Sequence, residues 1–419
     1  MPRIPGLVLT DHVVDVPLDH AVRGGPRIEV FAREVVAPDK IDADLPWLLF
    51  LQGGPGGKAP RPTGASGWIG RAVQTHRVLL LDQRGTGRST PLTAATLGEH
   101  TPAEQAAYIR NFRADSIVAD AEVLRARLTG GRPWDTIGQS YGGFVTLCYL
   151  SRAPEGLRTC YVTGGIPGIA ARAADVYART YPRVAAKNAA YYARYPGDVD
   201  TVRRIADHLD HDDVRLPDGD RLTSRRFRLL GGAFGMSDGF ERVHWIIDEA
   251  WHGDQLADPF LRQVMAMTCH AEGPMFALQE ITYNQGADAS GWAAEAELAR
   301  HPEFAPDADP LLFTGEMMYP WMFREIRALQ PFAEAADILA ETADWPMLYD
   351  PDRLAANQVP LMAAVYFDDM YVDSALQLET LAAIGSSRAW VTNEHEHDGL
   401  KQRNGEVLGR LMDMAAGKC

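Results

Sequence analysis

Ser140 stands in a glycine-rich run that could supply a nucleophile. The run GQSYGG begins at Gly138 and fits the pattern G-x-S-x-G. A short strand pattern precedes it and a helical pattern follows, so the chain must turn sharply and needs small residues beside the serine. Such a turn exposes the hydroxyl at the carboxyl end of a sheet, next to the positive end of a helix dipole. We therefore predict that Ser140 is a nucleophile. The alternative is an ordinary serine in a glycine-rich turn or phosphate loop.

Acidic and histidine residues follow two apolar runs late in the chain. A serine hydroxyl needs a histidine to accept its proton and a carboxylate to orient that histidine. With this type of turn, the chain order is serine, then the acid, then the histidine. The first late run ends before Asp368 and Asp369, and the second ends before His395 and His397. From the residues alone, each of these pairs stays ambiguous.

Backbone N–H groups must also stabilise the negative oxygen that develops on the substrate carbonyl. One donor is expected at Tyr141, directly after the serine. The loop QGGPGG at 52–57 is expected to supply the second, because glycines let backbone N–H groups approach a carbonyl closely. Gly54 or Gly53 is our choice for this donor. A dinucleotide-binding loop is disfavoured because Pro55 lacks an N–H group.

The elements around these residues indicate an α/β fold. Nearly continuous apolar runs mark strands that are buried on both faces of a parallel sheet, and helical patterns alternate with them. We predict a mostly parallel, doubly wound sheet of the α/β-hydrolase class, formed by 1–167 and 346–419. A helical cap, 168–345, is expected as an insertion. The strand patterns lie at 47–51, 78–81, 134–138, 160–163, 359–367 and 388–392, and one continuous helical pattern covers 102–128.

Composition and charge restrict the class of protein. The 419 residues are 46% hydrophobic and 23% charged, which is typical of a folded enzyme and excludes wholesale disorder. The formal net charge of −15 disfavours nucleic acid and anionic membranes as partners, because both require a positive field.

Targeting and metal-binding signals are not found in the sequence. We expect no signal peptide, and no membrane span because the sequence has no run of 18 or more apolar residues. Four widely spaced cysteines indicate reduced thiols and a cytoplasmic protein. Metal-binding motifs such as HExxH are missing, and we expect no metal and no cofactor. The oligomeric state stays open, and a homo-oligomer is compatible with the sequence.

Three segments together resemble the prolyl aminopeptidase (proline iminopeptidase) family of α/β-hydrolases. QGGPGG at Gln52 is similar to the family's HGGPG loop, with Gln in place of His. DQRGTGRS at Asp82 looks like the family's DQRG segment, and GQSYGG resembles its nucleophile turn. The order and spacing also match, and the insertion matches more weakly than the flanking parts. Asp82, Arg84 and Arg88 of the second segment are expected to form ion pairs that brace the neighbouring loops.

The resemblance implies a serine aminopeptidase that releases N-terminal residues, preferentially proline, from short peptides through an acyl-enzyme. It favours Asp369 over Asp368 and His397 over His395. In the family, glutamates of the cap pair with the free N-terminus of the substrate. Glu280 and Glu316, each among mostly apolar residues, have suitable character for that role.

Two points about the substrate stay open at this stage. A pocket of the size of proline is expected from four nearby aromatic residues, which are Trp292, Tyr319, Trp321 and Phe323. The alternative function is an esterase or amidase of the same fold that acts on small acyl substrates, since a fold does not determine a substrate. A third alternative is a catalytically inactive binding protein.

Overall fold

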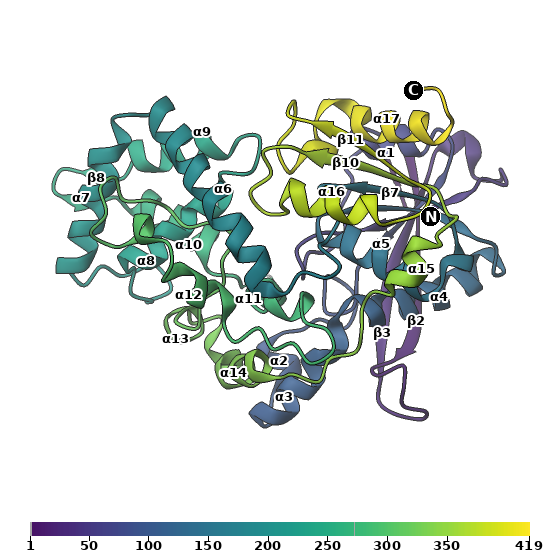
Figure 1. Cartoon of the computed structure of the whole chain (residues 1–419), viewed down its shortest axis with the longest axis horizontal. Helices are drawn as coiled ribbons and strands as arrows, with labels where there is room; N and C mark the ends of the chain where they lie inside the picture. Colours follow the sequence, from purple (N-terminus) through teal and green to yellow (C-terminus); the bar gives the residue numbers. More distant parts are fainter. Residues whose placement is uncertain (1, 272) are drawn as a thin grey trace.

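The chain folds into a sheet flanked by helices and a second region made of helices (Figure 1). The structure is a computed structural model and describes residues 2–271 and 273–419. In Figure 1 the sheet lies on the right and most of the helices between β7 and β10 lie on the left. We call the part of this segment from α6 to α14 the helical region.

The described residues contain one mixed sheet of nine strands, in the order β1-β2-β3-β5-β4-β6-β7-β10-β11. Neighbours from β1 to β5 pair antiparallel, and all pairs from β5 to β11 are parallel. The carboxyl ends of the parallel strands therefore meet at one edge. The bounds are β1 (Arg3–Ile4), β2 (Leu7–Pro17), β3 (Arg27–Val36), β4 (Trp47–Leu51), β5 (Arg77–Leu81), β6 (Trp134–Gln139), β7 (Leu157–Thr163), β10 (Leu361–Tyr366) and β11 (Ser387–Thr392).

Helices cover both faces of this sheet, as its apolar strands require. Leu48 and Phe50 of β4 face a cluster with α1 and α17, whereas Leu49 and Leu51 face a cluster with α4 and α5. Complete burial of one side chain of this size stabilises the folded state by about 1.5–3 kcal/mol. The helices that accompany the sheet are α1 (Gly67–Ala72), α2 (Ala94–Leu97), α3 (Pro102–Ile109), α4 (Ala114–Thr129), α5 (Tyr141–Arg152), α15 (Pro351–Ala355), α16 (Ser374–Ala382) and α17 (Glu406–Ala415).

The helical pattern over 102–128 forms two helices, α3 and α4, because the chain is extended at Arg113 between them (φ −96°, ψ 177°). The buried Arg113 guanidinium donates to the carbonyl of Asn284 and lies over the ring of Trp345, 4.5 Å from its centroid. Both partners are distant in sequence, so a helical pattern could not reveal the break.

The helical region has its own apolar core and also packs on α3 through α14. Its longest helix, α6, runs from the sheet towards the far end of the region (Figure 1). None of the helices in the described ranges is long and apolar enough to cross a membrane. The helices are α6 (Ala173–Arg194), α7 (Asp198–His211), α8 (Ser224–Phe227), α9 (Gly239–Asp248), α10 (Asp258–Thr268), α11 (Pro274–Ala277), α12 (Ala293–Leu298), α13 (Met322–Glu325) and α14 (Ala333–Glu341), with a hairpin of β8 (Trp251–His252) and β9 (Gln255–Leu256).

Candidate active site

Ser140 lies in the turn between β6 and α5, at the carboxyl edge of the sheet. Its backbone has φ 54° and ψ −126°, a conformation that costs a non-glycine residue about 1–3 kcal/mol. The Ser140 N–H donates to the carbonyl of Thr163 at 3.0 Å, and the Ser140 carbonyl accepts from the Gly143 N–H at 2.7 Å. The surrounding backbone therefore holds the turn in this strained state.

The glycines of the turn are required by close backbone contacts. A Cβ at Gly138 would lie 2.4 Å from the carbonyl oxygen of Gly142. A Cβ at Gly142 would lie 1.9 Å from the carbonyl oxygen of Leu51, and one at Gly143 would lie 2.1 Å from that of Gly165. None of the three positions has room for a side chain, which is the physical origin of the motif.

Asp369 and His397 contact each other directly. Asp369 Oδ2 lies 2.6 Å from His397 Nδ1, and the carboxylate is fully buried. The other oxygen, Oδ1, accepts the N–H groups of Tyr371 at 2.8 Å and Val372 at 3.1 Å. Hydrogen bonds therefore hold both carboxylate oxygens in place, and one of these oxygens fixes the orientation of the His397 ring.

The neighbours that the residues alone left as alternatives are placed differently. Asp368 is exposed. His395 is buried, but its ring packs edge-on against Tyr366 and Trp390, with centroids 6.3 and 6.0 Å away. The structure therefore brings Asp369 together with His397, and it does not bring Asp368 and His395 together in the same way.

The end of β7 connects this pair with Ser140. Thr163 accepts the Ser140 N–H, and a Cβ at the next residue, Gly164, would lie 3.2 Å from Asp369 Oδ2. Because Nδ1 of His397 is occupied by Asp369, Nε2 is the nitrogen left to act as a base. Burial lowers the pKa of His397, but Asp369 outweighs burial, so this pKa lies above its ordinary value.

The glycine loop lies against the serine. A Cβ at Gly53 would lie 2.8 Å from Ser140 Cβ and 3.5 Å from Ser140 Oγ. Gly54, the next residue, has φ 116°, which L-residues rarely adopt. Tyr141 is the first residue of α5, where backbone N–H groups have no acceptor within the helix. The predicted oxyanion donors, Gly53, Gly54 and Tyr141, are therefore at the serine.

The segment after β5 braces these loops. Asp82 is fully buried and accepts from the Arg61 guanidinium and, at 3.0 Å, from the Ala59 N–H, so it supports the chain that follows the glycine loop. Arg84 forms a buried pair with Asp120 of α4. The ion pair of the third expected residue, Arg88, lies at the surface.

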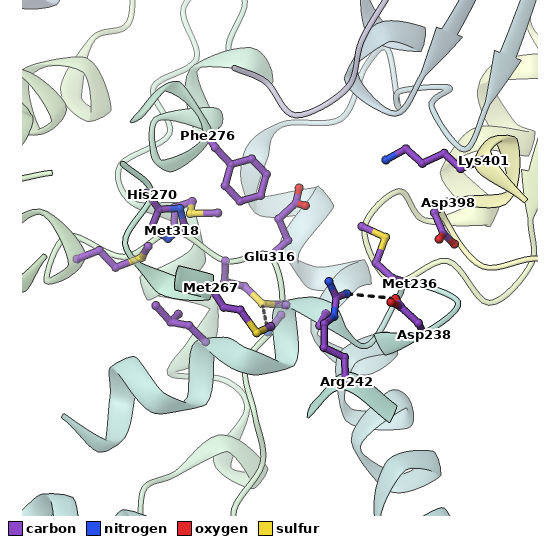
Figure 2. Close-up of a pocket in the computed structure, with 16 residues that line it drawn as sticks. Met236, Asp238, Arg242, Met267, His270, Phe276, Glu316, Met318, Asp398 and Lys401 are labelled. Atoms are coloured by element: carbon purple, nitrogen blue, oxygen red, sulfur yellow. Dashed lines mark hydrogen bonds and ion pairs between the residues drawn. The ribbon is translucent and has the colours of Figure 1, made fainter. Parts of the chain in front are cut away.

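A cavity of about 440 Å³ is lined by Glu316 and by Asp398, the residue after His397, and Figure 2 shows Glu316 pointing into it between Phe276 and Met236. A second hollow, of about 640 Å³, is lined by the glycine loop and shares Met267, His270 and Phe276 with the first. The two together extend from the loop beside Ser140 to Glu316.

Glu316 is half-buried and is close to the predicted catalytic pair. Burial raises its pKa to about 8, Asp369 adds to that rise, and His397 and the Gln279 side chain oppose it. Three phenols, Tyr177, Tyr283 and Tyr371, also interact with Glu316, and burial keeps their pKa values far above the ordinary value. Among the groups that set the pKa of this carboxyl, His397 can carry a positive charge, and neither an arginine nor a lysine takes part.

Glu280, the second predicted glutamate, is placed differently. Its carboxylate accepts the N–H groups of Ala293 at 3.2 Å and Ala294 at 3.0 Å, at the start of α12. Burial raises its pKa, whereas these N–H groups, Ser290 and Tyr177 lower it. Glu280 does not line the cavity that contains Glu316. This arrangement favours a structural role over the predicted contact with the substrate.

The aromatic pocket expected from the sequence is wrong. Tyr319 is buried and hydrogen-bonds Tyr181 at 3.0 Å, and Trp292 packs against Phe323. Methionines and Phe276 form the apolar wall instead, and the sequence beside Glu316 contains only three of these methionines. The methionines of the cavity are Met236, Met267, Met317, Met318 and Met322.

Within residues 2–271 and 273–419, no group of three or more His, Cys, Asp or Glu side chains is arranged to hold a metal ion. The arrangement described above can transfer an acyl group through a serine: a strained serine beside backbone N–H donors, and a histidine oriented by a carboxylate.

Comparisons with known proteins agree with this chemistry. Residues 46–225 match the family model for the alpha/beta hydrolase fold. The chain is 47% identical over 412 residues to the proline iminopeptidase of Aeromonas sobria, a match that covers 98% of this chain and 97% of that protein. It is 33% identical to a proline iminopeptidase of Aspergillus aculeatus, covering 95% and 91%. A solved esterase of Thermogutta terrifontis aligns with TM-score 0.41 and 15% identity, over 97% and 98% of the two chains.

Proposed function

The chain belongs to the proline iminopeptidase family of α/β-hydrolase-fold enzymes, and on that premise we propose that it is a serine aminopeptidase. Its substrates are short peptides with a free N-terminus, from which it releases the first residue, preferentially proline. The observation that carries this proposal is the Glu316 carboxyl group, which lines a cavity and interacts electrostatically with both members of the Asp369–His397 pair. A buried carboxyl of this kind is suited to a cationic ligand group.

The reaction proceeds through an acyl-enzyme. Ser140 Oγ attacks the carbonyl carbon of the N-terminal residue while His397 Nε2 accepts its proton, and Asp369 stabilises the charged imidazole. The N–H groups of Gly54 or Gly53 and of Tyr141 stabilise the oxyanion. His397 then donates the proton to the leaving amine, and water, activated by the same histidine, releases the acyl group.

The helical region encloses the substrate end of the site. We assign 168–345 to a cap and 1–167 with 346–419 to the catalytic core. The cap supplies Glu316 and limits the space beyond the scissile bond, which favours short peptides. Four unpaired cysteines support a cytoplasmic location.

Replacing Glu316 with glutamine tests the role of this carboxyl group. We expect kcat/KM for a prolyl arylamide to fall roughly 100-fold, the size of one lost charge-assisted hydrogen bond in a desolvated site. Hydrolysis of an N-acetyl-prolyl ester should change little, because that substrate carries no ammonium group. Steady-state kinetics on both substrates measure the difference.

Glu280→Gln is the matched control, because Glu280 has the same side chain in the same region and caps α12. It should lower the melting temperature and leave the preference for free-amine substrates intact. The aminopeptidase proposal is contradicted if Glu316→Gln lowers kcat/KM equally for both substrates. It is also contradicted if the unaltered enzyme prefers blocked substrates, and either result favours the esterase or amidase alternative.

The pH profile should contain two ionisations. His397 must be neutral to accept a proton, so activity is lost as the pH falls through its raised pKa. Glu316, with a pKa of about 8, must lose its proton to pair with an ammonium group, so kcat/KM for the prolyl arylamide should rise further through that pH. The upper rise should vanish in Glu316→Gln and with the blocked ester. Identical profiles for both enzymes would refute this assignment.

A further inference from the structure

Helix α6 of the helical region presents two long cationic side chains, Arg183 and Lys187, to the loops that carry the predicted catalytic pair. They are four residues apart and therefore lie on one face of the helix, one turn from each other. Figure 1 shows α6 running from the sheet into the helical region.

Arg183 contacts the loop of Asp369 at both of its ends. Its guanidinium donates to the carbonyl of Phe367 at 2.9 Å and to Ser374 Oγ at 2.8 Å, and it forms an ion pair with Asp373. Asp373 in turn accepts the Leu376 N–H at 2.9 Å and caps α16. One arginine therefore contacts both ends of the turn that carries Asp369.

Lys187 contacts the loop of His397. Its Nζ lies 2.6 and 2.7 Å from the two carboxylate oxygens of Glu396, the residue directly before His397. Only 11% of the lysine side chain and 33% of the glutamate side chain are exposed, so the pair is partly protected from water. A second contact joins the same loop to the helical region: the His397 N–H donates to the carbonyl of Gly235 at 3.0 Å.

The adjacent face of the same two turns holds the segment that carries Glu316. The Asn188 side chain donates to the carbonyl of Phe313 at 2.9 Å and accepts the Phe313 N–H at 2.8 Å. Val184 packs so closely that a Cβ at Gly315 would lie 2.4 Å from Val184 Cγ2. Glu316 follows Gly315 directly, so two turns of one helix contact the segments that carry Asp369, His397 and Glu316.

We propose that α6 is the positioning element of this active site, and that Arg183 and Lys187 are positioning residues. They act through the Asp369 and His397 loops and set the place of both side chains relative to Glu316. The helical region then determines catalytic geometry as well as access. A displacement of about 1 Å in such a site costs on the order of 100-fold in rate. The inference rests on the proposed function, because it assigns these loops to the catalytic pair.

The competing explanation is that these ion pairs only hold the helical region to the sheet. Arg179, one turn earlier on α6, offers a matched comparison: it reaches across to Glu379 of α16 at 3.7 Å, with both side chains at least half exposed. Exposed pairs of this kind contribute about 0–1 kcal/mol to stability. Arg179→Gln therefore removes a contact between the same two regions without touching either catalytic loop.

The experiment compares Arg183→Gln, Lys187→Gln and Arg179→Gln with the unaltered enzyme. The readouts are kcat and KM on a prolyl arylamide, the rate at which a fluorophosphonate labels Ser140, and the melting temperature. Arg183→Gln and Lys187→Gln should lower kcat and the labelling rate by roughly 10- to 100-fold with little change in KM. Arg179→Gln should behave like the unaltered enzyme, and Lys187→Arg should recover most of the activity.

A double variant separates positioning from the cost of an unpaired charge. Lys187→Met leaves Glu396 without its cation, whereas Lys187→Met combined with Glu396→Leu removes both charges. If positioning is the role, the double variant regains thermal stability and its kcat stays low. Full recovery of kcat in the double variant overturns the inference, as does a kcat within twofold of the unaltered enzyme in both glutamine variants. Failure of the proposed function looks different: the unaltered enzyme itself would not label at Ser140, or it would cleave N-blocked substrates in preference to free-amine substrates.

Discussion

Ser140→Ala is expected to abolish turnover of prolyl arylamides, with a loss in kcat of roughly 10⁴-fold or more. The substitution removes the only atom that forms the acyl bond, and residual hydrolysis then depends on the oxyanion donors and binding alone. Because alanine can keep the backbone contacts to Thr163 and Gly143, the fold should be retained. Steady-state kinetics and mass spectrometry of the fluorophosphonate-treated protein measure both parts of this prediction.

Ser151→Ala is a suitable control on the same helix. Ser151 is buried, and its hydroxyl donates to the carbonyl of Leu147 at 3.0 Å and accepts the Asp350 N–H at 3.1 Å. Its loss should cost about 1 kcal/mol of stability and leave kcat and labelling unchanged. Covalent labelling that persists in Ser140→Ala, or unlabelled protein before any substitution, would remove the basis for a serine mechanism.

Asp369→Asn is expected to lower kcat by roughly 10⁴-fold with little change in the fold. The asparagine oxygen can still accept the N–H groups of Tyr371 and Val372, so its amide N–H would face His397 Nδ1. That nitrogen would then have to accept a hydrogen bond, which places the ring proton on Nε2 and leaves no base for Ser140. The melting temperature and kcat of the purified variant measure the two halves of this prediction.

Asp368→Asn and His395→Gln are the matched controls for this pair, because each alters the same residue type one or two positions away. Asp368 is exposed and the His395 ring packs against Trp390, whereas the hydrogen bond of the pair joins His397 Nδ1 to Asp369 Oδ2. We expect both variants to keep kcat within a few-fold of the original value. If Asp368→Asn lowered kcat more than Asp369→Asn does, Asp368 would be the acid that orients the base.

Local patterns were sufficient where the constraint is local. The turn around Ser140 is recognisable because the three glycines that its close contacts require, Gly138, Gly142 and Gly143, lie within the same six residues. The strands of the parallel sheet are recognisable because burial on both faces demands continuous apolar runs. The order of serine, acid and histidine along the chain could be read for the same reason, since each follows the end of one strand.

Such patterns do not show in which direction a side chain points or which residues remote in the sequence it contacts. Asp368 and Asp369 differ only in which way a turn directs them, and Arg183 joins the ends of that turn from nearly two hundred residues away. Glu280 and Glu316 have similar apolar neighbours in sequence, yet one caps α12 and the other points into the cavity. Local composition indicates whether a side chain is buried, but it does not indicate which group that side chain contacts.

The amino-acid sequence by itself therefore determined the sheet, the strained serine and the residue types available to activate it, because short-range sterics and the periodicity of burial are written in adjacent residues. Only the tertiary structure decided which carboxylate orients which imidazole, which glutamate faces the cavity, and that α6 contacts both catalytic loops. Those are contacts between segments remote in the chain, and their free energies depend on atoms that only folding brings within a few ångströms of each other.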